Sequence, residues 1–240
     1  MNKERRLLLL SNSSIPTEPY FNWGKPFVKT FLGEAKVNVL FIPYAGVSID
    51  YDEYTKTVSD VYNSIGHEVV GIHTFENPKE AIKNCDALAI GGGNTFRLFE
   101  QLHALDLIDV INERIHGGMP YMGWSAGSNT ACPHLFTTND MPIVQPSSFE
   151  GLGQLPFQLN VHYTNASIDG HGGETRDMRL KEFKILHPNT HLIGLRECSL
   201  IEVKGEEYYL KGRGNTMKLF RNDGNYEEIP EGIFRSSDWD

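Results

Sequence analysis

A serine between two glycines is the strongest chemical signal in the sequence. Ser125 stands in Gly123-Trp124-Ser125-Ala126-Gly127, directly after a short apolar stretch and before a segment that can start a helix. A strand that reverses sharply into a helix has room only for small residues two places either side of the serine, and the turn exposes the hydroxyl. The pattern predicts a nucleophile elbow. A glycine-rich turn with an ordinary N-capping serine has the same spacing.

A nucleophilic serine needs N–H donors for the negative charge that develops on the substrate oxygen. Three glycines, Gly91 to Gly93, follow another predicted strand, and glycine lets the backbone turn its N–H groups toward a ligand. We expect the N–H of Gly92 or Gly93, together with that of Ala126, to form an oxyanion hole. A phosphate-binding turn or a plain tight connection would use the same glycines.

The serine also needs a general base. His162 follows an alternating, strand-like stretch and precedes polar loop residues, which is where a base at a strand end is expected. His134, His171 and His187 lie in predicted loops and compete for this role.

A third group must hold the imidazole in one tautomer. Asp140 and Glu197 are both candidates for the catalytic carboxylate, and the sequence leaves the choice between them open. Each of them would also fit a loop residue that caps a helix or pairs at the surface.

Metal and cysteine chemistry have less support. His171-Gly172-Gly173-Glu174 contains potential ligands, but no recognised ligand spacing occurs, so we expect no metal and no cofactor. No cysteine occupies an elbow, and Cys132, about two helical turns after Ser125, is expected in the core.

Composition narrows the class of protein. The chain has 240 residues with 40% hydrophobic and 22% charged residues, which is ordinary for a globular protein. Its net charge of −9 argues against nucleic acid or an anionic membrane as a partner. Three cysteines without a C-x-x-C motif fit a reducing compartment. With no leader or membrane span expected, the prediction is a cytoplasmic protein; its oligomeric state is open.

Strands and helices alternate along the first half of the chain. Strands are predicted at 7–10, 37–43, 68–72, 87–90 and 120–122, and helices at about 52–65, 78–84 and 95–116, the last broken near 104–106. This order predicts an α/β fold with a doubly wound, largely parallel sheet. Short strands at 192–195, 199–203, 207–210 and 217–220 are expected to add antiparallel strands to one edge, and a single domain over 1–240 is expected.

Several segments in order resemble the peptidase E family, serine peptidases that also include the cyanophycinases. The similarity is carried by residues 7–13 (LLLLSNS), 41–47 (FIPYAGV), 91–96 (GGGNTF), 123–127 (GWSAG), 137–144 (TTNDMPIV), 162–166 (HYTNA) and 173–176 (GETR). The resemblance implies a flavodoxin-like relative of the class I glutamine amidotransferases that hydrolyses dipeptides with N-terminal aspartate.

The resemblance also assigns roles to residues. It implies Ser125 as nucleophile, His162 as base, and Arg176 as the partner of the substrate's β-carboxylate. A guanidinium can hold a carboxylate through two parallel hydrogen bonds, which suits that role. Two positions depart from the family pattern: Val161 replaces the usual proline and Cys198 the usual glycine beside Glu197.

Two alternative functions also fit the sequence. A cyanophycinase-like hydrolase would act on an aspartate-rich polymer and would need an open groove. A non-catalytic module that binds an acidic small molecule would keep Arg176 but would not need Ser125 and His162 together.

Overall fold

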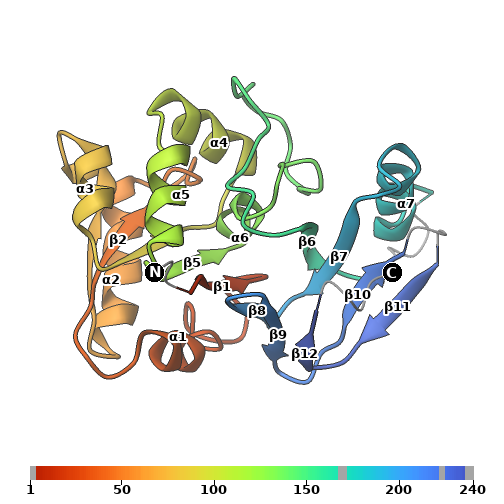
Figure 1. The fold of residues 1–240 in the computed structure, drawn as a ribbon, viewed down its shortest axis with the longest axis horizontal. Helices are drawn as coiled ribbons and strands as arrows, with labels where there is room; N and C mark the ends of the chain where they lie inside the picture. The colour runs from red at the N-terminus through yellow and green to blue at the C-terminus, as the bar shows by residue number, and fades with distance from the viewer. Residues whose placement is uncertain (1–3, 167–171, 222–224, 236–240) are drawn as a thin grey trace.

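An eight-stranded sheet forms the centre of the molecule. The computed structural model describes residues 4–166, 172–221 and 225–235. The strand order is β12-β9-β8-β1-β5-β4-β2-β3 (Figure 1). The strands are β1 (Arg6–Leu10), β2 (Asn38–Ile42), β3 (Glu68–Gly71), β4 (Ala87–Ile90), β5 (Tyr121–Trp124), β8 (Ser199–Lys204), β9 (Glu207–Gly212) and β12 (Gly232–Phe234). Strands β1 to β5 pair in parallel, and β8, β9 and β12 pair antiparallel at one edge, so the predicted α/β fold is confirmed.

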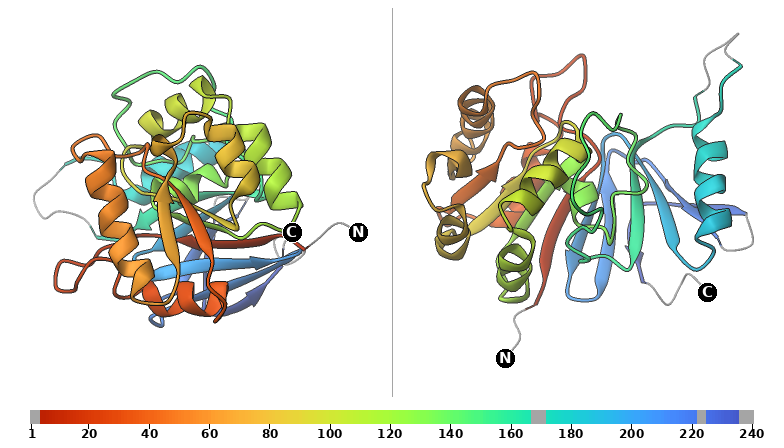
Figure 2. Two further views of the ribbon diagram at one scale, coloured as in Figure 1. Left: turned by 90° about the vertical axis from the view of Figure 1, so that its left-hand side faces the viewer. Right: turned by 90° about the horizontal axis from the view of Figure 1, so that it is seen from above.

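Helices cover both faces of this sheet (Figure 2). Successive side chains of a strand point to opposite faces. Accordingly, Leu7 and Leu9 pack in the core with α3 (Pro78–Asn84), α4 (Thr95–Ala104) and α5 (Ile108–His116). Leu8 and Leu10 pack in a second core with α1 (Lys25–Leu32) and α2 (Tyr51–Asn63). The all-leucine β1 is thus a strand buried on both faces.

Local signals explain where several helices begin. Asp50 accepts a hydrogen bond from the Asp52 N–H at 2.8 Å and caps α2, and Asn77 caps α3, which has Pro78 in its first turn. The expected break in the 95–116 segment separates α4 from α5. No helix within the described residues is long and apolar enough to cross a bilayer.

Helices α1 and α7 (Arg176–Leu186) were not predicted from the sequence. Helix α1 has only eight residues, which is shorter than the stretch over which a helical period can be recognised. Within α7 only Leu180 and Lys184 are buried, so its apolar stripe is weak.

A second sheet lies at the end of the molecule opposite α3 (Figure 1). Its order is β11-β10-β7-β6, with α7 beside it. The strands are β6 (Phe157–Tyr163), β7 (His191–Arg196), β10 (Met217–Phe220) and β11 (Tyr226–Ile229). The expectation that 192–195 and 217–220 extend the main sheet was therefore wrong. Strand β7 pairs with β6 instead, and Gly194 leaves room for the Tyr163 ring, since a Cβ there would lie 2.6 Å from it.

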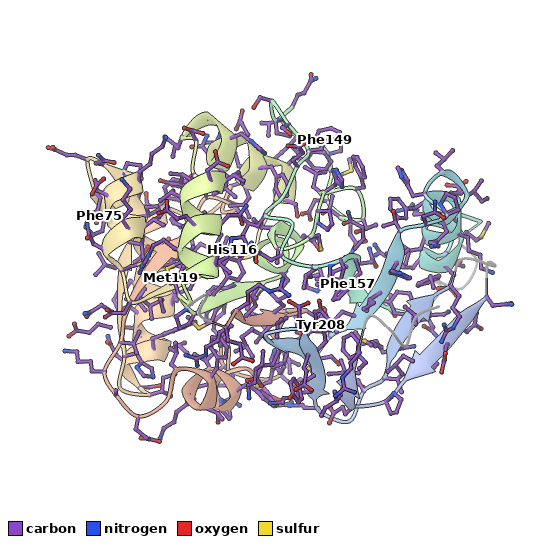
Figure 3. The ribbon with its side chains drawn as sticks, in the orientation of Figure 1. Phe75, His116, Met119, Phe149, Phe157 and Tyr208 are labelled. Carbon is purple, nitrogen blue, oxygen red and sulfur yellow. The ribbon has the colours of Figure 1, made fainter. Side chains whose placement is uncertain are left out.

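The two sheets meet through aromatic packing. Phe157 at the start of β6 and Tyr208 of β9 lie side by side at this junction (Figure 3), with ring centroids 5.3 Å apart. Both side chains belong to the same core as Leu7 and Leu9. This packing holds the start of β6 in the second sheet against β9 of the first.

Candidate active site

Ser125 occupies a tight turn between β5 and the short helix α6 (Ala126–Thr130). Its backbone has φ 54° and ψ −115°, a conformation that L-residues rarely adopt. A Cβ on Gly123 would lie 2.4 Å from the Gly127 carbonyl oxygen, and one on Gly127 would lie 2.1 Å from the Ile90 carbonyl oxygen. Both glycines are needed for backbone contact, so the turn has the geometry expected of a nucleophile elbow.

Each of the three glycines after β4 lies against a different neighbour, and Gly92 lies against this turn. A Cβ on Gly91 would meet the Tyr54 hydroxyl at 2.7 Å, one on Gly92 the Ser125 Cβ at 3.0 Å, and one on Gly93 the Ala45 carbonyl oxygen at 2.1 Å. Gly93 also has φ +139°, which favours glycine.

The predicted oxyanion donors are available. No hydrogen bond within the described part of the chain uses the N–H groups of Gly92, Gly93 or Ala126. The flanking N–H groups are occupied, because Gly91 donates to the Ile42 carbonyl at 3.1 Å and Asn94 to the Ala45 carbonyl at 2.8 Å. The loop is therefore fixed at both ends, and its Gly92 lies next to Ser125.

His162 lies between the serine and a carboxylate. Its Nε2 is 2.8 Å from the Ser125 Oγ, and its Nδ1 is 2.8 Å from the Glu197 Oε1. The His162 side chain is 36% exposed and that of Glu197 55% exposed. With Nδ1 protonated and donating to Glu197, Nε2 can accept the serine proton, which is the arrangement of a serine, histidine and acid triad.

The backbone of His162 is held in an unusual conformation at a bulge in β6. Its φ is 52°, and the register between β6 and β7 shifts between Asn160 and Tyr163. The His162 N–H donates to the Ser11 Oγ at 2.8 Å, and that hydroxyl donates to the Leu195 carbonyl at 2.9 Å. Ser11 is fully buried directly after β1, so it joins the main sheet to the strands that carry both His162 and Glu197.

Glu197 and Cys198 form the turn between β7 and β8. The Cys198 N–H donates to the Asn12 Oδ1 at 2.8 Å, and the Glu197 carbonyl accepts from the Asn215 Nδ2 at 2.9 Å. Cys198 has φ 60°, which explains physically why a glycine would suit this position. The cysteine is accommodated with Glu197 still in contact with the imidazole.

Asp140, the other candidate carboxylate, lies at the start of α4. Its Oδ2 accepts from the Thr95 N–H at 2.7 Å, from the Thr95 Oγ1 at 2.6 Å and from the Thr138 Oγ1 at 3.1 Å. A carboxylate at a helix N-terminus satisfies a free N–H and interacts favourably with the helix dipole. Of the two open candidates, the structure thus brings Glu197 to His162 and Asp140 to the helix that follows the glycine loop.

The competing histidines lie in other surroundings. His134 stacks on Phe136 with ring centroids 4.7 Å apart, and His187 stacks on Phe183 at 4.5 Å. His171 lies outside the described residues. Among the residues that are described, no cluster of His, Cys, Asp or Glu is arranged to hold a metal ion.

Arg176 is the first residue of α7 and is half-buried. Burial and the neighbouring Arg179 lower its pKa, and no carboxylate in the described ranges forms an ion pair with it. The next residue, Asp177, accepts from the Tyr163 hydroxyl and from the Lys218 Nζ, both at 2.5 Å. These bonds tie the start of α7 to Tyr163, the residue after His162. Arg176 is thus a partly desolvated cation at the start of the helix that packs beside the second sheet.

Three residues that bond to the segments of the site were not predicted from the sequence: Ser11, Tyr54 and Asp177. Ser11 follows directly after β1, and its place at the carboxyl end of a parallel strand was a usable signal. Tyr54 lies at the apolar spacing of a core helix with Val58 and Tyr62, and nothing in that pattern distinguishes it.

Comparison with known proteins places the chain in a family. The model described as Peptidase family S51 matches residues 7–211. The chain belongs to Peptidase family S51. As a member of family S51 it is a serine-type peptidase, and relatives named Peptidase E agree with this assignment. The resemblance predicted from the sequence is confirmed.

Family S51 relatives match this chain along most of its length. Peptidase E of Nostoc sp. is 45% identical over 217 residues, covering 90% of this chain and 89% of the relative. Peptidase E of Shewanella oneidensis is 45% identical over 223 residues, covering 93% of each.

Two solved structures share the S51 fold. A putative Peptidase E protein from Listeria monocytogenes superposes with a TM-score of 0.68 at 22% identity, over 88% of this chain and 99% of that one. A peptidase from an acI-B1 Actinobacterium gives a TM-score of 0.69 at 16% identity, over 98% and 96% of the two chains.

Proposed function

We propose that this S51 peptidase hydrolyses dipeptides whose first residue is aspartate, with Ser125 as the nucleophile. The observation that carries the proposal is the continuous contact from the Ser125 Oγ to the His162 Nε2 and from the His162 Nδ1 to the Glu197 Oε1, each 2.8 Å. A binding module has no need for such a chain of groups next to free backbone donors.

In the proposed mechanism, Ser125 attacks the carbonyl carbon of the aspartyl residue while His162 takes the serine proton. The oxyanion accepts hydrogen bonds from the Ala126 N–H and from the Gly92 or Gly93 N–H. His162 then protonates the leaving amine. A water molecule attacks the acyl-enzyme with His162 again as base, and the free aspartate leaves.

Glu197 is the proposed third member of the triad. By accepting the Nδ1–H it keeps Nε2 free to accept the serine proton, and it stabilises the imidazolium that forms during attack. The proposed role of Asp140 is to fix the start of α4 and with it the end of the glycine loop.

Arg176 is the proposed partner of the substrate's β-carboxylate. The chain has a net charge of −9, so an acidic substrate needs a local cation, and Arg176 is partly desolvated without a carboxylate partner in the described ranges. Removing one member of such a charge pair costs about 2–5 kcal/mol of substrate interaction.

We also propose a cytoplasmic location. Cys85, Cys132 and Cys198 are free thiols, which fits a reducing compartment.

The first test is hydrolysis of Asp-Leu, Glu-Leu, Asn-Leu and Ala-Leu by the purified protein, measured as free amino acids, with Ser125→Ala as control. The expected result is cleavage of Asp-Leu alone and a loss on the order of 10⁴–10⁶ in the Ser125→Ala variant. An intact Asp-Leu would overturn the dipeptide proposal. Release of β-Asp-Arg from cyanophycin would favour the polymer, and tight aspartate binding without turnover would favour a binding role.

The second test addresses Arg176. Arg176→Met is expected to lower kcat/KM for Asp-Leu by about 10²–10³-fold, because the β-carboxylate would lose its charged partner. Arg179→Met is a matched control one turn along α7, since Arg179 is 64% exposed and lies 3.7 Å from Glu174. Equal losses in the two variants would contradict the role of Arg176 in specificity.

A further inference from the structure

The hydroxyl of Tyr54 links the two segments that carry the oxyanion donors. Tyr54 lies on α2 with 8% of its surface exposed, and its Oη is 3.1 Å from the Gly92 carbonyl oxygen and 3.1 Å from the Trp124 Nε1. An indole N–H can only donate, so the hydroxyl accepts from Trp124 and donates its own proton to Gly92. Burial raises the pKa of Tyr54, which keeps this proton in place at physiological pH.

Aromatic packing fixes where this hydroxyl lies. The Phe41 ring stacks on Trp124 with centroids 5.6 Å apart, and it meets the Tyr54 ring edge-on at 5.0 Å. Gly91 completes the arrangement, because a Cβ there would lie 2.7 Å from the Tyr54 Oη. The Tyr54 hydroxyl reaches the Gly92 carbonyl because the Phe41 ring packs against the Tyr54 ring and because Gly91 has no Cβ in the way.

The bond to the Gly92 carbonyl controls the direction of an N–H group. The described chain has no cis peptide bond, so the Gly92 C=O and the Gly93 N–H point in opposite directions across one planar unit. A peptide between two glycines has the least steric resistance to rotation. If it turned over, the Gly92 carbonyl oxygen would replace the Gly93 N–H and would repel an oxyanion.

We propose that Tyr54 is a positioning residue for the oxyanion hole, holding the Gly92–Gly93 peptide so that the Gly93 N–H faces the developing oxyanion. Through Trp124 the same hydroxyl keeps this peptide in register with the strand end that carries Ser125 and Ala126. The inference rests on the proposed serine mechanism and adds a group to it that does not touch substrate.

The test is Tyr54→Phe, which keeps the ring and removes the hydroxyl. Loss of one oxyanion donor costs about 10²–10³ in kcat, and a donor that is misdirected part of the time costs less. The expected result is a fall in kcat for Asp-Leu of about 10- to 100-fold, with KM within about threefold. The pH profile of kcat/KM is expected to keep its wild-type midpoint, because His162 and Glu197 are untouched.

A second readout does not depend on the peptide substrate. A fluorophosphonate reacts with the serine hydroxyl: the Oγ–P bond forms, the P–F bond breaks with release of fluoride, and the proton passes to His162. The phosphonyl oxygen occupies the oxyanion hole, so the labelling rate of Ser125 is expected to fall by the same factor as kcat. Wild-type protein that is labelled at Ser125 but leaves Asp-Leu intact would overturn the dipeptide proposal and still allow the Tyr54 test.

Tyr62→Phe is the matched control. Tyr62 lies two turns along α2, is fully buried, and its hydroxyl contacts the Met122 Sδ at 3.5 Å, away from the glycine loop. The expected result is a kcat within about twofold of wild type. The proposal is overturned if Tyr54→Phe keeps wild-type kcat and labelling rate, or if Tyr62→Phe loses as much as Tyr54→Phe.

If circular dichroism shows that Tyr54→Phe does not fold, Trp124→Phe tests the proposal instead. This variant removes the indole N–H that holds the Tyr54 hydroxyl, together with part of the ring that stacks on Phe41, and leaves the hydroxyl itself. A fall of several-fold in kcat and in labelling rate is expected, and unchanged values would overturn the proposal.

Discussion

The two halves of the site are built in different ways. Ser125 and its backbone donors belong to the eight-stranded sheet, where backbones touch and a Cβ on Gly127 would lie 2.1 Å from a carbonyl oxygen. His162 and Glu197 come from the strand ends of the second sheet, with side chains 36% and 55% exposed. Close backbone packing fixes the first half, whereas hydrogen bonds between side chains and the backbone fix the second. Substitutions in the second half should therefore change rate with little loss of fold.

Within the second half of the site, the largest effect is expected from Glu197→Gln. The amide cannot stabilise the imidazolium as a carboxylate does, and it can hold His162 in the wrong tautomer. We expect kcat/KM for Asp-Leu to fall by about 10²–10³-fold, with an unchanged free energy of unfolding in urea. The loss is smaller than for a fully buried triad acid because water reaches this side chain.

Asp140→Asn is the control for Glu197→Gln. Asp140 is bonded to Thr95 and Thr138 at the start of α4, so its charge supports the helix and not the imidazole. We expect a rate loss under about tenfold and a destabilisation of about 1 kcal/mol. A rate loss as large as that of Glu197→Gln would contradict the assignment of Glu197.

A smaller effect is expected from Ser11→Ala, which tests the link between the two halves. This variant removes the acceptor of the His162 N–H and the donor to the Leu195 carbonyl. A buried group left without its partner costs about 1–3 kcal/mol, and we expect kcat to fall by about tenfold as the imidazole loses its fixed position. Differential scanning calorimetry and steady-state kinetics measure the two losses. Unchanged kcat would show that the second half positions itself without the first.

The smallest effect is expected from Cys198→Gly. Cys198 has φ 60°, a conformation that costs a non-glycine residue about 1–2 kcal/mol. Glycine removes this strain. It also raises the conformational entropy of the unfolded chain, which lowers the free energy of unfolding by about 0.4–1 kcal/mol. The net expectation is a stabilisation of about 0.5–1 kcal/mol in urea unfolding, with kcat within twofold. A destabilisation would mean that packing of the Cys198 side chain stabilises the fold by more than the backbone strain costs.

Local chemistry explains which parts of the fold were predictable. Strand β4 and helix α3 were predicted with their observed bounds because a four-residue apolar run and an Asn-Pro helix start are signals within a few residues. The partner of β7 was predicted wrongly, because pairing with β6 depends on packing between Tyr163 and Gly194, thirty-one positions apart in the numbering.

The same division applies to the site. Ser125 and the glycines were predicted because a sharp turn and close backbone contacts allow few residue types. These positions therefore form a motif that can be recognised in the sequence. The choice between Asp140 and Glu197 could not be made, because it depends on which strand end reaches His162. Tyr54 was missed because its spacing on α2 is that of an ordinary core residue. The partner of its hydroxyl is a backbone carbonyl, which any residue can supply, so the sequence does not indicate the contact.

The backbone contacts of the elbow have a consequence for how the protein tolerates mutation. In a saturation library scored by cellular abundance, Gly123 and Gly127 should be as intolerant as core leucines, because any side chain meets a carbonyl group within 2.4 Å. Ser125 between them should tolerate change, and Ser125→Gly should raise abundance by relieving φ 54°. In a library scored by hydrolysis of Asp-Leu, Ser125 should tolerate no substitution, so the difference between the two maps would locate the nucleophile.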